Sequence, residues 1–275
     1  MKWTITVVVG VVCASCGGAS PLIRLPAGPG APAADAADVL AAATAVCRAV
    51  RTVTAEVAVS GSVGGKRVRG RLLAGVAAPA SVRLEAAAPF GPPAFIFVAS
   101  NIGATLLLPR DDRVLEHGRP DAVLEAVTGV PVGAADLKTT LTGCASSPQV
   151  TGRQVGDWRI LTPAGTGDRA VESEWYLRRE PTPGMWRLVT AVHPSRDGRW
   201  RAEYGDFQSG LPRSIRLASE DAQRFDLRLT LSQMEINTPL DADVFTVKIP
   251  PSAFPITLDE LRRSGPFGTA ASDGP

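Results

Sequence analysis

Two cysteines, Cys13 and Cys16, stand three residues apart near the start of the 275-residue chain. This Cys-x-x-Cys spacing is used by thioredoxin-type dithiols and by half of a structural zinc site. A redox pair needs a helix N-terminus to lower the thiol pKa, and a structural zinc ion needs four ligands. Only an apolar run precedes the pair, and no second Cys-x-x-Cys or paired histidine follows it. We therefore predict neither redox chemistry nor zinc binding at these sulfurs.

The residues around this pair predict another kind of chemistry, which is lipid attachment during export. Lys2 supplies a positive charge, and the apolar run 3–12 is too short to span roughly 30 Å of hydrocarbon. The stretch 13–16, Cys-Ala-Ser-Cys, resembles a bacterial lipobox, except that its first residue is usually leucine. The resemblance implies cleavage after residue 15 and lipidation of Cys16. The alternative is an ordinary cleaved signal that happens to end in cysteine.

Side chains that could serve an enzyme are few, and none stands in a catalytic pattern. The histidines, His117 and His193, do not have a metal-binding spacing such as HExxH. Asp111 and Asp112 could bind a cation, but a turn of this composition is more often simply solvated. The stretch 61–66, GSVGGK, departs from a P-loop, because arginine follows where Ser or Thr must hold Mg²⁺. We predict a protein that is not an enzyme and has no cofactor or metal.

Cys47 and Cys144 are the cysteines that remain after the predicted cleavage, apart from the anchor. An exported compartment permits disulfides. A bond between these two would close a loop of about 100 residues, which is worth on the order of 4–5 kcal/mol in the chain-entropy model. We expect the disulfide; two buried free thiols are the alternative.

Composition limits the classes of function. The net charge of +2 gives no argument for nucleic-acid binding. Hydrophobic residues make up 45% of the chain, but no segment after the signal is long and apolar enough for a transmembrane helix. We therefore predict a protein that is anchored to a membrane by its lipid rather than threaded through it.

Four regions follow one another along the chain. Residues 1–15 are predicted to be the signal peptide. Residues 16–35 are rich in Gly, Pro and Ala and predict a flexible tether. Residues 36–255 are predicted to form the domain, and residues 256–275 a short helix with a flexible tail.

Within the domain, the period of the apolar residues changes several times. A helix is predicted over residues 36–50, and alternating patterns then predict about six strands. Two short helices are expected over residues 120–143, with glycines at their ends. Six or seven further strands follow, the last of them over residues 244–250.

This order of elements predicts a mainly β fold of about 11–12 strands. Strands joined by short turns favour one antiparallel sheet that curls toward a barrel, with the middle helices as a plug or lid. The inward face would be apolar. The pattern leaves open whether that face lines a cavity or fills a sandwich core.

Three motifs stand in sequence between residues 84 and 144: Pro89-Phe90-Gly91, Gly129-Val130-Pro131-Val132 and Leu141-Thr142-Gly143. With the strand patterns around them, they resemble the LolA/LolB-like superfamily of periplasmic lipoprotein carriers and receptors, and LolB-like outer-membrane lipoproteins most closely. The resemblance is most specific in this block and extends over most of residues 53–253.

The resemblance implies an incomplete antiparallel barrel, with a lid of helices over an apolar cavity that holds acyl chains. We expect this cavity to be lined by the inward-facing residues Val57, Val59, Val68, Leu72, Val82, Leu84, Phe95, Phe97, Leu227 and Leu229.

In that family a hydrophobic loop also reaches from the rim toward the membrane. The matching residues here are Phe90, Pro92 and Pro93. An exposed phenylalanine with two prolines would be a rigid apolar wedge. The alternative is a buried proline-rich turn.

These expectations combine into a lipid-anchored, periplasm-facing protein that binds acyl chains and assists delivery of lipoproteins or lipids to the outer membrane. Its expected partners are acyl chains, the membrane that holds the anchor, and a soluble periplasmic carrier. Gly17 after the anchor favours the outer membrane over inner-membrane retention. The alternative function is a non-enzymatic envelope scaffold or sensor with a filled core.

Overall fold

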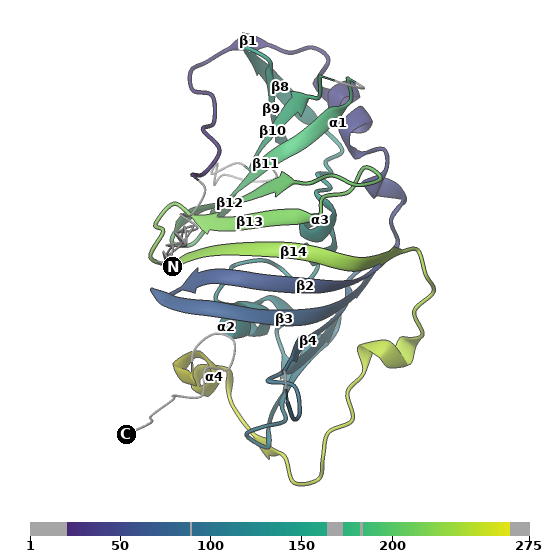
Figure 1. Cartoon of the computed structure of the whole chain (residues 1–275), viewed down its shortest axis with the longest axis vertical. Helices are drawn as coiled ribbons and strands as arrows, with labels where there is room; N and C mark the ends of the chain where they lie inside the picture. Colours follow the sequence, from purple (N-terminus) through teal and green to yellow (C-terminus); the bar gives the residue numbers. More distant parts are fainter. Residues whose placement is uncertain (1–20, 89, 164–172, 182–183, 265–275) are drawn as a thin grey trace, which may run out of the picture.

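The computed structural model describes residues 21–88, 90–163, 173–181 and 184–264. Cys16, the predicted site of lipid attachment, and Pro89 lie outside the described residues. The described strands form one 15-stranded sheet in the order β1-β8-β9-β10-β11-β12-β13-β14-β2-β3-β4-β5-β6-β7-β15. Neighbouring strands are antiparallel, apart from the parallel pair β15 and β7. The sheet twists strongly along its length but does not close into a barrel (Figure 1).

The predicted mainly β fold is confirmed, with 15 strands where 11–12 were expected. Two of the strands, β1 (Ala31–Pro32) and β15 (Phe254–Pro255), have only two residues each. The six strands before the middle helices are β2 (Thr52–Val63), β3 (Lys66–Ala77), β4 (Ser81–Ala87), β5 (Ile96–Ser100), β6 (Gly103–Leu108) and β7 (Arg113–Gly118). The seven strands after them are β8 (Val150–Val155), β9 (Trp158–Pro163), β10 (Glu174–Arg179), β11 (Trp186–Ser195), β12 (Gly198–Gly205), β13 (Ser214–Ser219) and β14 (Phe225–Ile236).

The prediction of a strand over residues 244–250 is wrong. A 3-10 turn, η2 (Ala242–Phe245), stands there instead, and the chain then runs on without strand pairing until β15. The reason is a side chain: Arg83 Nη1 donates hydrogen bonds to the carbonyls of Val244, at 3.3 Å, and Thr246, at 3.0 Å. These carbonyls are satisfied by the guanidinium, so they need no strand partner.

The centre of the sheet is built by β14, β2 and β3, in which apolar residues alternate with polar ones. In β2, Val57 and Val59 are each 3% exposed, while their neighbours Ala58 and Ser60 are exposed. Val57 pairs with Leu231 on one side and Leu72 on the other, so apolar side chains are matched across three strands. The sheet therefore has one apolar face.

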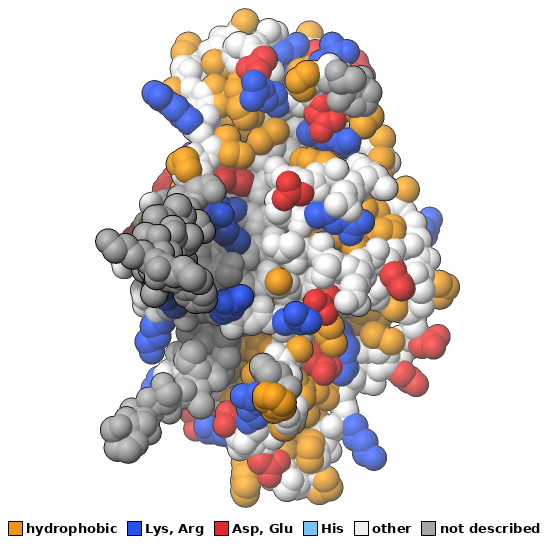
Figure 2. All heavy atoms as spheres, viewed as in Figure 1, with side chains coloured by type: hydrophobic (Ala, Val, Ile, Leu, Met, Phe, Trp, Pro, Cys, Tyr) orange, Lys and Arg blue, Asp and Glu red, His pale blue; other side chains and the backbone are white. Residues whose placement is uncertain are grey.

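The opposite face of the sheet carries paired charges. Arg216 and Asp226 form an ion pair at 2.6 Å between adjacent strands, and Glu174 binds both Arg153 and Arg199 at 2.9 Å. Figure 2 shows Lys and Arg interspersed with Asp and Glu over the visible face of the molecule. This mixed charge suits a solvated surface.

Two short helices, α2 (Pro120–Thr128) and α3 (Leu137–Thr142), cover the apolar face. We call residues 120–143 the cover. Pro120 begins α2, where its missing N–H costs nothing. Gly129 and Gly143 end the two helices at φ values of 71° and 61°, a left-handed conformation that favours glycine. The buried residues of the cover, among them Leu124, belong to the same hydrophobic core as the sheet.

The remaining helices are α1 (Ala36–Thr44), the 3-10 turn η1 (Cys47–Ala49) and α4 (Leu258–Ser264), which packs against α2. No helix within the described ranges is long and apolar enough to cross a membrane.

The described part of the predicted tether, residues 21–35, packs against the fold instead of standing away from it. The backbone N–H of Ile23 donates to Glu203 Oε1 at 2.8 Å, and Arg201 donates to the carbonyl of Ile23 at 3.1 Å. Leu25 packs against a small apolar cluster on the outer face of the sheet, and β1 extends the sheet edge by pairing with β8. The segment is fixed because its backbone groups find partners on the strands.

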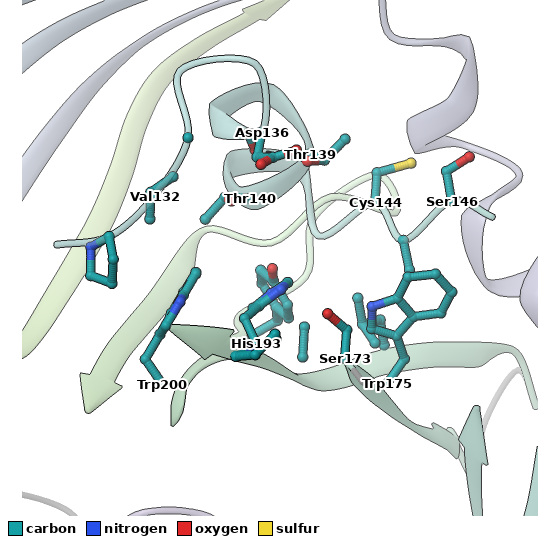
Figure 3. A pocket seen from close by; sticks show the side chains of 17 residues that line it. Val132, Asp136, Thr139, Thr140, Cys144, Ser146, Ser173, Trp175, His193 and Trp200 are labelled. Atoms are coloured by element: carbon teal, nitrogen blue, oxygen red, sulfur yellow. Dashed lines mark hydrogen bonds between the residues drawn. The ribbon is translucent and has the colours of Figure 1, made fainter. Parts of the chain in front are cut away.

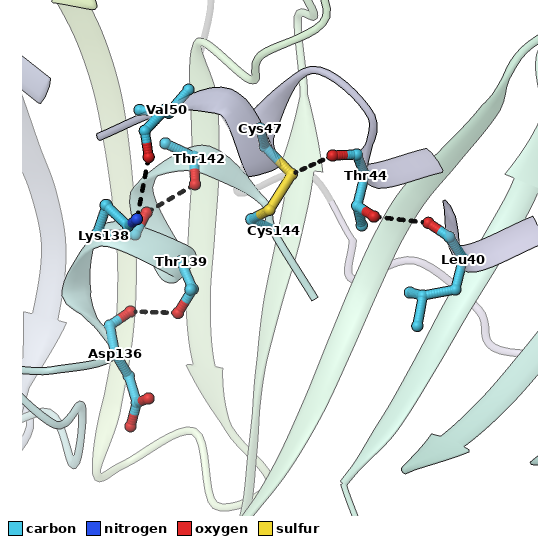
Figure 4. The surroundings of a disulfide bond; sticks show 9 residues. All are labelled: Leu40, Thr44, Cys47, Val50, Asp136, Lys138, Thr139, Thr142 and Cys144. Carbon is cyan, nitrogen blue, oxygen red and sulfur yellow. Dashed lines mark hydrogen bonds between the residues drawn. A yellow bond between two sulfur atoms is a disulfide. The ribbon is translucent and has the colours of Figure 1, made fainter. Parts of the chain in front are cut away.

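The predicted disulfide between Cys47 and Cys144 is confirmed, with a Cα–Cα distance of 5.6 Å. It joins the end of the α1 segment to the residue that follows the cover (Figure 4). Beside it, Lys138 Nζ donates a hydrogen bond of 3.0 Å to the carbonyl of Val50. Together these links attach the C-terminal end of the cover to the chain that leads into β2. The disulfide also favours an extracytoplasmic location.

Replacing both Cys47 and Cys144 with serine should lower the free energy of unfolding by about 4–5 kcal/mol, because the bond spans 97 residues. Urea denaturation of both proteins, with and without reductant, measures this. Reductant should shift the parent protein and leave the double variant unchanged. A loss below about 1 kcal/mol would contradict the expected constraint on the unfolded chain.

Candidate functional site

The space between the cover and the apolar face of the sheet contains two cavities. The smaller has a volume of about 70 Å³, and only Thr128 among its lining residues is polar. It is lined by Val57, Val59, Leu72, Ala74, Leu84, Leu124, Thr128, Val130, Val132, Leu137, Leu141, Leu217, Leu227 and Leu229. We call it the apolar cavity.

Six of the ten residues predicted to line a lipid cavity stand around this apolar cavity: Val57, Val59, Leu72, Leu84, Leu227 and Leu229. The other four do not line it. Val82, Phe95 and Phe97 are fully buried in the surrounding core, and Val68 is half-buried against that core. Their role in lipid binding stays a prediction.

The size of the apolar cavity constrains what it can hold in this state. Ligand pockets usually have volumes of about 300–1,000 Å³, so about 70 Å³ leaves no room for an acyl chain. Leu124, Leu137 and Leu141 of the cover contribute to its wall. The inner face of the sheet is therefore covered by side chains of the protein itself.

The larger cavity, of about 520 Å³, lies between the cover and strands β10, β11 and β12 (Figure 3). Both apolar and polar side chains line it, and we call it the amphipathic cavity. Val132 lines this cavity and the apolar one as well. The two spaces therefore adjoin at the loop between α2 and α3.

The floor of the amphipathic cavity is aromatic. Trp175 from β10, His193 from β11, and Trp200 and Tyr204 from β12 line it. His193 and Trp200 are paired across adjacent strands, and their rings stack with centroids 4.4 Å apart. Burial lowers the pKa of His193 from its ordinary value of 6.5 to about 4, so the imidazole is neutral at pH 7. Burial likewise raises the pKa of the Tyr204 phenol.

The opposite wall is polar and belongs to the cover. Asp136, just before α3, and Thr139 and Thr140 within α3 line the cavity on the side of the cover, across from the strands that carry the rings (Figure 3). Partial burial, and then the negative charge of Asp121, raise the pKa of the Asp136 carboxyl. Asp121 itself accepts a hydrogen bond of 2.8 Å from the N–H of Ala134. The cavity thus combines aromatic surface with a few polar groups, as binding sites for small molecules do.

No group of three or more His, Cys, Asp or Glu side chains that could hold a metal ion occurs within the described part of the chain. Asp112 lies in the turn between β6 and β7, where its carboxyl accepts a hydrogen bond from Ser252 at 3.1 Å.

The rim below β4 and β5 carries the predicted membrane-facing loop. Phe90 is 91% exposed, Pro92 is exposed, and Pro93 is half-buried. Arg110 Nε donates a hydrogen bond of 3.2 Å to the carbonyl of Pro92, which ties the loop to the β6–β7 turn. Phe90 is thus exposed to solvent and does not lie in a buried turn.

Phe254 is a second phenylalanine on this rim, and sequence analysis did not select it. It is 70% exposed, and its N–H donates a hydrogen bond of 2.8 Å to the carbonyl of Asp112 in the same turn. Prolines flank it at residues 250, 251 and 255, as they follow Phe90 at residues 92 and 93. That repeated Phe–Pro composition was the available signal.

The aromatic floor was also missed by sequence analysis, which chose cavity residues from the strands before the cover and from the strand that contains Leu227 and Leu229. A signal existed, because Trp158, Trp175, Trp186 and Trp200 all lie in the second half of the chain. Their alternation with polar residues did not distinguish the inner face from the outer one. Trp175 and Trp200 line the cavity, whereas Trp158 packs against the outer apolar cluster.

Comparison with known proteins gives the class of fold. No family model and no curated protein matches the chain. Among solved structures, it is similar to a LolA superfamily protein from Nitrosomonas europaea, with 15% identity and a TM-score of 0.55, over 77% of this chain and 97% of that one.

Two further structures are similar over a comparable length. One is a putative outer membrane lipoprotein-sorting protein domain from Vibrio parahaemolyticus, with 12% identity and a TM-score of 0.46, over 76% of this chain and 97% of that one. The other is the lipoprotein LppX from Mycobacterium tuberculosis, with 14% identity and a TM-score of 0.33, over 75% and 99%.

The similarity to the Nitrosomonas europaea structure defines the class of fold as LolA-like: one large antiparallel sheet, not closed into a barrel, with few helices. The superfamily resemblance inferred from sequence is confirmed at the level of fold. These comparisons do not distinguish LolB-like proteins from other proteins with this fold.

Replacing His193 with phenylalanine should make the protein less sensitive to acid. Between pH 6.5 and about 4 the unfolded chain binds a proton that folded His193 does not, so stability falls as the pH falls through this range. The contribution lost is up to about 3 kcal/mol. Urea denaturation at pH 7 and at pH 4.5 measures the difference between parent and variant. An imidazole signal of His193 that titrates near pH 6.5 by NMR would contradict its burial.

Proposed function

We propose that this protein is a lipid-anchored envelope protein that binds acyl chains on the inner face of its sheet and assists delivery of lipoproteins or lipids to the outer membrane. One observation carries the proposal. The apolar part of the sheet face that lines the apolar cavity is closed by a short helical cover, and it adjoins an amphipathic cavity of about 520 Å³. An acyl chain and its headgroup need an apolar space and a polar space side by side.

Binding in this proposal is an exchange of apolar contacts. An acyl chain that leaves water gains roughly 0.8 kcal/mol per buried CH₂ group. The side chains of the cover, such as Leu124 and Leu141, now pack where the chain would lie. The cover moves outward as the chain enters, and the chain replaces the apolar contacts that are lost. Cys144 keeps the C-terminal end of the cover attached during this movement.

Low specificity for the chain follows from this mechanism, because apolar contacts are not directional. Release to a membrane requires that the bilayer hold the chain more tightly than the protein does. The net affinity is lowered by the energy of displacing the cover. The proposal therefore favours a protein that transfers its ligand over one that stores it.

The anchor and the location belong to the same proposal. Cys16 carries the lipid, and Gly17 after it favours the outer membrane. The LolA-like fold supports a relation to lipoprotein localisation, and a LolB-like receptor that accepts cargo from a soluble periplasmic carrier is the most specific form of the proposal. The lining residues act by burial, so no catalytic group is needed.

A second candidate function is a non-enzymatic envelope scaffold or sensor with a filled core. The small volume of the apolar cavity, about 70 Å³, favours it. The two candidates differ in whether the cover ever leaves the sheet, and ligand binding decides between them.

Replacing Leu72 with glutamate should abolish binding of acyl chains, because it puts a carboxylate in the wall of the apolar cavity. Leu73→Glu is the matched control, since Leu73 is the next residue of β3, is 46% exposed and faces the other side of the sheet. Native mass spectrometry of each protein, purified after export, measures copurified acylated ligands.

Parent and control should carry ligand, and Leu72→Glu should be empty although folded by circular dichroism. Binding that survives in folded Leu72→Glu would contradict the assigned wall. A parent protein that stays empty after incubation with lipoprotein would favour the scaffold.

The loop Phe90, Pro92 and Pro93 faces the membrane in this proposal, together with Phe254. Replacing Phe90 and Phe254 with serine should weaken binding to phospholipid vesicles about tenfold or more, because two large apolar groups no longer enter the interface. Stability should change little, since the side chains are 91% and 70% exposed. Vesicle cosedimentation of the unlipidated protein measures this.

Ile102→Ser is the control for this experiment. Ile102 is 95% exposed in the turn between β5 and β6, at the other end of these strands from Phe90. Its replacement should leave vesicle binding unchanged. Equal losses in both variants would show that general surface hydrophobicity, and not the rim, drives binding.

A further inference from the structure

The charge of the amphipathic cavity is one-sided. Of the described residues that line it, Asp136 has the only acidic side chain, and none is Lys or Arg. His193 is neutral at pH 7, so it adds no positive charge. A ligand that brings an anionic group into this space would find no cation of the protein to pair with.

The Asp136 carboxylate is available to a ligand. Its side chain has no hydrogen bond or ion pair with the rest of the described chain. Lys138, the nearest cationic residue in sequence, donates to the carbonyl of Val50 on the other side of the cover. Asp136 is exposed at the edge of the cavity, where a headgroup would enter.

A second carboxylate adds to the negative field at this edge. The side chains of Asp136 and Asp121 both flank Gly133: a Cβ atom there would lie 2.8 Å from Asp136 Oδ2 and 3.3 Å from Asp121 Oδ1. Any larger residue at position 133 would collide with the first carboxylate. Two acidic groups beside one residue favour a cation over an anion.

The aromatic floor can add to this preference. The faces of Trp and Tyr rings carry negative charge density and attract ammonium groups, which is how quaternary ammonium ligands are recognised in proteins. Trp175, Trp200 and Tyr204 are each 5–6% exposed, so the rings are held in place by the core. Cation–π contacts in a desolvated site are worth up to about 2 kcal/mol.

We propose that the amphipathic cavity binds the positively charged headgroup of an amphiphile, an amine or a quaternary ammonium, with its acyl chain directed across Val132 to the apolar cavity. This inference rests on the proposed function in acyl-chain binding. It adds that the protein selects its ligand by headgroup charge, through Asp136 and the rings of Trp175 and Trp200.

Three probes that each have a twelve-carbon chain test the proposal: dodecyltrimethylammonium, dodecanoate (whose chain includes the carboxylate carbon) and dodecyl maltoside, each below its micellar concentration. Isothermal titration calorimetry with the delipidated full chain gives the dissociation constants. We expect the ammonium probe to bind about tenfold or more tightly than the other two, which corresponds to roughly 1.4 kcal/mol.

The variant Asp136→Asn should remove most of this preference and leave dodecanoate binding unchanged or stronger. Glu125→Gln is the matched control, because Glu125 is an exposed carboxylate on α2 of the same cover and does not line either cavity. It should keep the full preference. Trp200→Leu should weaken ammonium binding more than maltoside binding, provided that circular dichroism shows a folded protein.

Three other results would each contradict a specific part of the proposal. If the three probes bind equally, acyl-chain binding stands and charge selection is wrong. If the ammonium preference persists in Asp136→Asn, the headgroup site is assigned to the wrong place. If none of the probes binds, the proposed function itself fails and this inference fails with it.

Discussion

The pairing of β14 with β2 holds the two halves of the sheet together. Apart from the two-residue edge strands β1 and β15, the strands before the cover form one half and those after it form the other. β14 and β2, each of 12 residues, are the seam between the halves. The pairing runs from Phe225 opposite Val63 to Ile236 opposite Val53. Residues more than 160 positions apart are thereby brought within backbone hydrogen-bonding distance.

Both the cover and the cavities depend on this seam. The apolar cavity takes Val57 from one half and Leu227 from the other, so neither half alone would enclose it. The cover connects the halves in sequence and packs over the place where they join in space. The disulfide from Cys47 to Cys144 fixes one end of that connection. An element that opens at one end and is fixed at the other can expose a surface without detaching from it.

Much of the fold could be predicted from the sequence, because its local signals agree. Alternation in β2 and β3, proline at the start of α2 and glycine at the ends of α2 and α3 each has one simple structural solution. The error over residues 244–250 has a different origin. That segment has the composition of a strand, but the carbonyls of Val244 and Thr246 accept hydrogen bonds from the side chain of Arg83. Arg83 is 161 residues away from Val244 in sequence. No local pattern encodes such a contact.

The candidate site was predicted only in part, because a sequence pattern shows which way residues face but not how much space lies between them. Alternation identifies inward-facing residues, and six of the ten chosen ones do line a cavity. Alternation does not reveal volume, because volume depends on how closely the cover packs. The larger cavity lies over the rings of Trp175, Trp200 and Tyr204, which the fold brings together from two different strands.

The docking of residues 21–35 against the sheet limits how much chain can separate the folded body from a lipid anchor at Cys16. Ile23 is fixed by Glu203 and Arg201, so if Cys16 carries the proposed lipid, only four residues separate that anchor from Pro21. Four residues and their flanking bonds span at most roughly 18 Å. In the proposed lipid-anchored form, a body held this closely could not travel across the envelope to collect a ligand. It would work as a stationary dock at the bilayer surface, and any long-distance traffic would fall to a diffusible partner.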